Sequence, residues 1–189
     1  MERAFVSWKT RSVKNGAAVT DLRGVDRVYA MMDGESFKNG FPAGAAFHFN
    51  PDFKRDTLLV DCLINIENML VCSERLKSFI QAKSPDKVEY LPVTVHDHKG
   101  KGVADPYFII HPIDPPDCID FAKSDVTWSA MDKSTIQFVD HLEFDEARVA
   151  PSRLLFRAKA YNGAILLRRE FAREIEAAGF KGAGWREIP

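Results

Sequence analysis

The chain has 189 residues, with 26 basic and 27 acidic side chains and a formal net charge of −1 at pH 7. This length favours a single domain that buries a core without disulfides or a metal ion, and the near-neutral charge argues against general nucleic-acid binding. No segment is apolar over the length needed to cross a bilayer, and residues 1–8 lack the basic and apolar regions of a signal peptide. We therefore expect a cytoplasmic protein without a membrane partner.

Residues 1–57 are rich in glycine and aromatic side chains and show little regular periodicity. Turn signals such as Asp33-Gly34 and Asn39-Gly40 recur in this part. We expect residues 1–57 to form an irregular N-terminal part and residues 58–189 to form the main domain. The alternative is one continuous domain over residues 1–189.

The middle of the chain predicts a strand–helix–strand unit. Met69–Cys72 is a short apolar strand, and Ser73 follows it as a helix N-cap. Pro85 ends the helix, and residues 88–95 form the next strand. The apolar face of this helix consists of Leu76, Phe79 and Ile80.

The C-terminal end predicts a second unit of the same plan. Ala164–Leu167 is apolar, and Gly179 stands where a left-handed helix terminus favours glycine. A last strand is expected around Trp185–Ile188. The apolar face of the helix is predicted from side chains four residues apart, at Leu167, Phe171 and Ile175.

Further strands are predicted at Thr57–Leu63, Tyr107–Ile110 and Leu154–Ala158, whereas Ser134–Phe144 fits a strand or a helix. Helices and strands are mixed without strict alternation. The expected fold is therefore α+β, with a mostly antiparallel sheet, two or more packed helices and two similar helix–turn–strand units.

The acidic side chains are concentrated in one segment of the chain. Val103–Glu146, called the acidic segment below, holds ten acids and two lysines, a charge of −8, against +2 for residues 1–102 and +5 for residues 147–189. Such segregation is typical of a surface that selects a partner of opposite charge. It is equally typical of a solvated face that keeps a protein soluble.

The three cysteines, Cys62, Cys72 and Cys118, form no CxxC pair and match no zinc spacing. We expect reduced, packed thiols, and a Cys62–Cys72 disulfide is an open alternative. No nucleophile elbow, P-loop or dinucleotide fingerprint occurs, so no catalytic or cofactor-binding residue is predicted. The remaining catalytic hypothesis is a small metal-dependent hydrolase that uses His96, His98 and His111.

Three parts of the chain, between roughly residues 60 and 188, share the pattern of a known family. They are Met69–Lys77, Tyr107–Pro112 with Cys118-Ile119-Asp120 and Ser124, and Leu155-Phe156-Arg157 with the helix that leads to Gly179–Gly182. Together they resemble a bacterial polymorphic-toxin immunity family, formerly a domain of unknown function. Pro115-Pro116 and Ala183-Gly184-Trp185 depart from that family's pattern.

The resemblance implies a non-catalytic protein that binds and neutralises a cognate toxin, without cofactor or metal. It also gives the acidic segment a role, because a toxin with a basic working surface is complemented by an acidic inhibitor. Trp128 is alternatively a core residue, and a third hypothesis is an adaptor that docks through residues 1–57. The candidate partner-binding residues are Asp114, Asp117, Asp120, Phe121, Asp125, Trp128 and Asp132.

Overall fold

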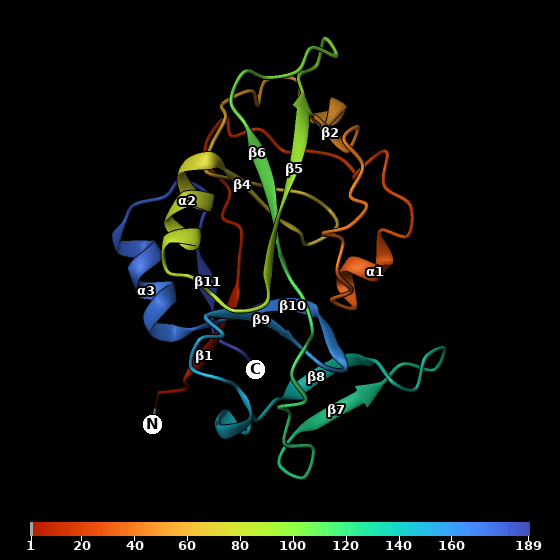
Figure 1. Cartoon of the computed structure of the whole chain (residues 1–189), viewed down its shortest axis with the longest axis vertical. Coiled ribbons are helices and arrows are strands. Elements are labelled where there is room, and N and C mark those ends of the chain that lie inside the picture. Colours follow the sequence, from red (N-terminus) through yellow and green to blue (C-terminus); the bar gives the residue numbers. More distant parts are fainter. Residues whose placement is uncertain (1) are drawn as a thin grey trace.

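The computed structural model describes residues 2–189, which build two sheets and a separate hairpin (Figure 1). The first sheet has the order β2 (Ala46–His48), β5 (Val88–His96), β6 (Tyr107–Pro112), β4 (Leu70–Ser73) and β3 (Cys62–Leu63). The second has the order β11 (Trp185–Arg186), β1 (Phe5–Trp8), β10 (Tyr161–Arg168) and β9 (Leu155–Ala158). The hairpin pairs β7 (Asp125–Trp128) with β8 (Ile136–His141).

Strands dominate, and the helical elements are few. They are α1 (Tyr29–Met32), α2 (Glu74–Ala82), α3 (Arg169–Ala177) and the short 3-10 turns η1 (Pro51–Phe53) and η2 (Glu146–Arg148). Among the named strands of residues 2–189, the β2–β5 pair is parallel and the others are antiparallel. This architecture agrees with the expected α+β class, while the similarity of the two predicted units stays a prediction. Within residues 2–189, no helix reaches the length and apolarity that crossing a bilayer demands.

Helix α2 begins where the sequence predicts it. The Ser73 side chain accepts a hydrogen bond from the Leu76 amide at 3.3 Å, which satisfies one of the free amides of the first turn. Leu76 and Ile80, four residues apart, are fully buried, and the chain leaves the helix at Ser84, whose φ is 50°. The cap and the apolar spacing therefore determine both the position and the packing of α2.

Helix α3 starts later than its apolar spacing indicates. The predicted helical face included Leu167, but this residue lies in β10, opposite Val6 of β1. The backbone of Leu167 joins a sheet ladder, and this tertiary pairing overrides the four-residue spacing. Phe171 and Ile175 are on α3 and are buried as predicted, and Gly179 takes the left-handed conformation with φ 68°.

Three apolar clusters hold the layers together. The middle cluster lies between the two sheets and receives α2 and α3, which lie side by side on one flank in Figure 1. The Phe79 and Phe171 rings stack across these helices with centroids 6.5 Å apart. The second cluster lies under the N-terminal part on the first sheet, and the third lies between the second sheet and the hairpin. The hairpin is thus held on the face of the second sheet that α3 does not cover.

The N-terminal part supplies strands that its composition does not predict. β1 lies between β10 and β11, and β2 pairs with β5. A boundary at residue 57 stays a prediction. The strand expected at Thr57–Leu63 is confined to Cys62–Leu63, because Leu58 makes only an isolated bridge to Gly16 and is 44% exposed.

Candidate functional site

The second half of the acidic segment forms a structured projection, not a loose tail. Hairpin β7–β8 projects at the lower right of Figure 1, away from α2 and α3. Strand β8 is fastened at both ends by backbone hydrogen bonds, from the Ile136 amide beside the connecting turn to the Ala160 carbonyl at 2.8 Å and from the Leu142 amide at the open end to the Pro189 carbonyl at 3.0 Å. Ile136 and Leu142 are also buried in the third apolar cluster. Side chains on the outer surface of the hairpin are therefore presented on a supported frame.

The outer surface of this region carries exposed aromatic side chains. The Phe121 and Trp128 rings lie 5.2 Å apart at 42°, and each residue is 41% exposed. Phe138 is 62% and Met131 100% exposed nearby in the chain. Large apolar side chains that remain exposed together are typical of an interaction surface. We call the contacting pair Phe121 and Trp128 the hairpin aromatic patch, since Phe138 pairs with Thr127 and lies on the other face of the hairpin.

Sequence reasoning selected Phe121 and Trp128 but missed Phe138 and Met131. Simple alternation places Phe138 on the same face as the buried Ile136, two residues earlier. The pairing register shifts between Thr127 and Trp128, so that Phe138 is opposite Thr127 whereas Ile136 is opposite Trp128. This bulge changes the face on which the following side chains lie, so it exposes Phe138.

Three of the five predicted aspartates hold local structure. Asp114 forms ion pairs with Arg153 and Lys87, both at 3.3 Å. Asp120 pairs with Lys123 at 2.8 Å, and this hydrogen bond lowers the pKa of the Asp120 carboxyl. Hydrogen bonds from Ser134 and Thr135 lower the pKa of Asp132 to about 2 and close the hairpin turn.

Asp117 and Asp125 differ from these three. Both are exposed, and neither carboxylate has an ion pair or hydrogen bond within the part of the chain that the structure describes. Their charges are therefore available to a partner at no cost to an existing contact. Asp125 begins β7, the strand that also carries Trp128.

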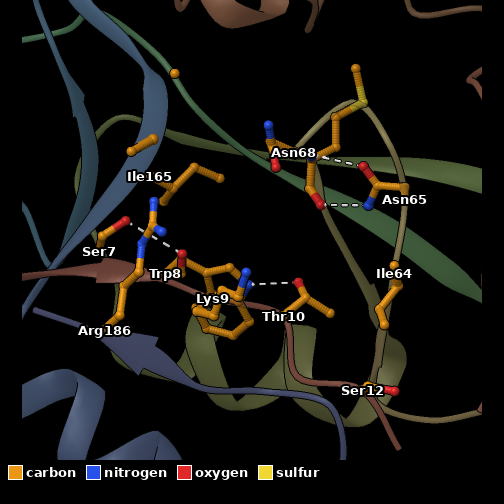
Figure 2. A pocket seen from close by; sticks show the side chains of 13 residues that line it. Ser7, Trp8, Lys9, Thr10, Ser12, Ile64, Asn65, Asn68, Ile165 and Arg186 are labelled. Atoms are coloured by element: carbon orange, nitrogen blue, oxygen red, sulfur yellow. Dashed lines mark hydrogen bonds between the residues drawn. The ribbon is translucent and has the colours of Figure 1, made fainter. Parts of the chain in front are cut away.

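A second feature, absent from the sequence predictions, is a cleft between the two sheets (Figure 2). Its volume is about 400 Å³, within the range of small binding sites. Residues of β1 and Arg186 of β11 line one side, and Ile64, Asn65 and Asn68 lie across from them in Figure 2. The Asn65 side chain holds the far wall in place. Its Nδ2 donates to the Met69 carbonyl at 2.8 Å, and its Oδ1 accepts from the Met69 amide at 2.9 Å.

The family of the chain follows from comparison with known proteins. The model of the immunity protein family Imm11 matches residues 10–189, nearly the whole chain. The chain belongs to this family. The match confirms the resemblance read from three segments of the sequence. A comparison of the Imm11 protein with curated proteins gave no match.

The histidines considered for a metal site lie in two different places of the Imm11 protein. His96 ends β5 and stacks on His48 with ring centroids 4.7 Å apart, and His98 contacts Phe49 edge-on at 5.3 Å. His111 lies opposite Glu89, seven residues before His96 on β5, so a strand rise of about 3.3 Å per residue separates it from His96 by about 23 Å. Within residues 2–189, no group of three or more histidine, cysteine or acidic side chains is arranged to hold a metal ion.

His111 has instead a buried polar environment. It is 2% exposed, and its Nε2 donates to the Glu35 carbonyl at 2.7 Å. Glu89 beside it accepts hydrogen bonds from the Phe37 amide at 2.8 Å and from the Ser36 hydroxyl. Burial lowers the pKa of His111, the Arg157 charge adds to this, and the hydrogen bond to Glu35 and the Glu89 charge oppose it.

The lowered pKa predicts how acid acts on the folded Imm11 protein. The unfolded chain takes up a proton at His111 near the ordinary histidine pKa of about 6.5, whereas the folded chain takes up this proton only at lower pH. The free energy of unfolding should therefore fall as the pH drops below about 6.5, and this contribution should be constant above it. His111→Gln keeps a donor for Glu35 and should flatten that slope. Urea unfolding of both proteins between pH 5 and 8 checks this, and parallel pH profiles would contradict it.

The three cysteines of the Imm11 protein are buried free thiols, as the sequence predicts. Cys62 and Cys72 lie opposite each other on β3 and β4. Burial raises the pKa of Cys62 and of Cys118, each to about 12, so both thiols are poor nucleophiles.

Proposed function

We propose that this Imm11 protein is a non-catalytic inhibitor that binds and neutralises a cognate toxin in the cytoplasm of the bacterium that makes both. The observation that carries this proposal is the family match over residues 10–189. An immunity protein acts by occupying its toxin, so its activity depends on a surface and not on reacting groups.

The proposed contact surface is the hairpin aromatic patch together with the five aspartates predicted from the sequence. It contains the seven residues selected from the sequence: Asp114, Asp117, Asp120, Phe121, Asp125, Trp128 and Asp132. Two physical properties support this surface. Its exposed rings provide apolar contact area of the kind that dominates binding energy. The segment's charge of −8 attracts a basic partner and orients it before contact.

The proposal treats residues 1–189 as one binding unit and not as a docking part joined to a separate domain. β1 supports this view, because it pairs with β10 on one side and with β11 on the other. Arg3 also donates to the carbonyl of Leu142, close to the hairpin, at 3.1 Å. The support of the proposed surface thus depends on both ends of the chain.

Charge reversal at the two unpaired aspartates tests the electrostatic part of the proposal. In Asp117→Lys/Asp125→Lys, affinity for the toxin domain encoded beside this gene should fall about fivefold at low salt, because each exposed pair is worth under about 1 kcal/mol. The dependence of affinity on salt should also become shallower. Calorimetric titration at 50 and 300 mM salt measures both.

The matched control is Asp26→Lys/Asp52→Lys, which changes the net charge equally at exposed positions outside the acidic segment. It should leave affinity near the unmodified value. If both double variants lose affinity alike, the effect comes from total charge, and the proposed surface is wrong. If the unmodified chain neither binds nor neutralises the toxin domain, the proposed function itself is wrong.

A further inference from the structure

The cleft between the sheets arises where β1 and β10 diverge. Their pairing ends at Ser7 and Leu166. Beyond Trp8 the chain turns to the C-terminal turn instead, with the Lys9 amide bonded to the Gly184 carbonyl at 2.9 Å. β10 also bulges between Tyr161 and Leu166 relative to β9, and bulges are frequent next to binding sites. The cleft is thus a consequence of strand geometry and is present without a ligand.

The walls of the cleft are held by side-chain contacts. The Trp8 indole donates to the Thr10 hydroxyl at 3.1 Å, and that hydroxyl lies 3.3 Å from the Cys62 sulfur. Asn65 fixes the opposite wall through Met69. A cleft with fixed walls loses little entropy when it is filled.

The charges that line this cleft are all positive. Lys9 and Arg186 are the charged residues among those lining it, and both are exposed. Neither forms an ion pair within residues 2–189, whereas Arg11, two residues after Lys9, pairs with Glu176. The cleft therefore carries two cations whose charge no carboxylate of the described chain neutralises by direct pairing.

The register places these cations beside a buried hydroxyl. Ser7 lies directly opposite Arg186, and Lys9 lines the same cleft just beyond the end of β1, with its amide bonded to the carbonyl of Gly184, two residues before Arg186. Diagonal neighbours of this kind have Cα atoms about 7–8 Å apart, which one carboxylate with two long side chains can span. Ser7 is 3% exposed, and among the residues that the structure describes its hydroxyl makes only a long hydrogen bond of 3.4 Å, to the Trp8 carbonyl. Ser7, Lys9 and Arg186 thus combine three donor side chains without a competing acid.

We propose that this cleft binds an acidic, extended segment of a protein partner, with a carboxylate between Lys9 and Arg186. This proposal rests on the proposed function in one respect, because it takes the segment that fills the cleft to be part of a protein. Charge complementarity selects the acid, and the exposed Ile64 at the rim offers apolar contact to the neighbouring residues of the segment. The site is opposite in charge to the hairpin surface, so one partner that reached both would be bound in a single orientation.

The test is an NMR titration of the full-length ¹⁵N-labelled chain with three probes. These are acetyl-Glu-Ala-Glu-Ala-amide, its lysine counterpart and inorganic phosphate. The acidic peptide should shift the amides of Ser7, Lys9, Gly163 and Arg186, and the lysine peptide should not. Lys9→Glu/Arg186→Glu should weaken binding of the acidic peptide at least tenfold, while Lys38→Glu/Arg55→Glu, with the same charge change at exposed positions elsewhere, should weaken it less than twofold.

A second variant fills the cleft without changing charge. Gly163 lines the cleft, and a Cβ atom there would meet no other atom within 4 Å. The Gly163→Leu variant should therefore fold normally, and its binding of the acidic peptide should still be at least fivefold weaker. Equal losses in the two charge variants, or no shifts at the cleft amides, would overturn the proposal. If phosphate bound as tightly as the acidic peptide, the cleft would be a site for free anions, and the proposal of a protein partner would be wrong. None of these outcomes depends on the toxin, so they are separate from failure of the proposed function.

Discussion

Gly182→Ala is expected to lower the free energy of unfolding by at least about 3 kcal/mol. Gly182 has φ 84°, in the left-handed region, and a Cβ atom there would overlap the Cys62 carbonyl oxygen. That oxygen belongs to the backbone and cannot rotate away. Hydrogen bonds also hold the neighbouring backbone in place. The Cys62 amide donates to the Lys181 carbonyl at 3.0 Å, and the Arg11 amide donates to the Gly182 carbonyl at 2.8 Å. Urea unfolding measures the loss.

Gly179→Ala is the matched control for this substitution. Gly179 has a similar φ of 68°, but a Cβ atom there would have open space within 4 Å. Its substitution should cost only the left-handed strain, about 1–2 kcal/mol. If Gly182→Ala were no more destabilising than Gly179→Ala, the contact among the N-terminal segment, β3 and the C-terminal turn would not be as close as described.

Trp128→Ala is expected to weaken binding of the toxin domain at least thirtyfold, about 2 kcal/mol or more. Trp128 combines a large exposed ring with a position on the supported hairpin, and its ring lies against Phe121. Truncation removes the ring and leaves Phe121 without its neighbour. Surface plasmon resonance should show the loss mainly as faster dissociation, because short-range contacts hold the formed complex.

Two comparisons separate binding from folding for Trp128→Ala. Tyr29→Ala removes an exposed ring, 65% accessible, from α1 and should leave affinity unchanged. The thermal midpoint of Trp128→Ala should also stay close to that of the unmodified chain, because the residue is already 41% exposed. Unchanged toxin affinity would remove Trp128 from the proposed surface, whereas a binding loss that follows the loss of folded protein would make Trp128 the structural residue considered as the alternative.

The parts of the fold that sequence predicted are those determined by neighbouring residues. Ser73 caps α2 because its hydroxyl reaches an amide three residues away, and Gly179 ends α3 because glycine accepts a positive φ. The strand at residues 88–95 is close to the observed β5, Val88–His96. The charge of −8 on the acidic segment and the resemblance to the immunity family could likewise be recognised from the sequence alone.

What only the tertiary structure decided depends on residues far apart in the chain. β1 is a strand because β10 and β11 pair with it, more than 150 residues away. The aspartates are alike in the sequence, yet within residues 2–189 Asp114 is paired with Arg153 and Asp125 has no ion pair, because folding brings a cation to Asp114 alone of these two. The cleft beside Lys9 and Arg186 exists because two strands diverge between sheets. Local chemistry determines caps, turns and segment charge, whereas pairing register and strand divergence are set by long-range contacts that no short stretch of sequence contains.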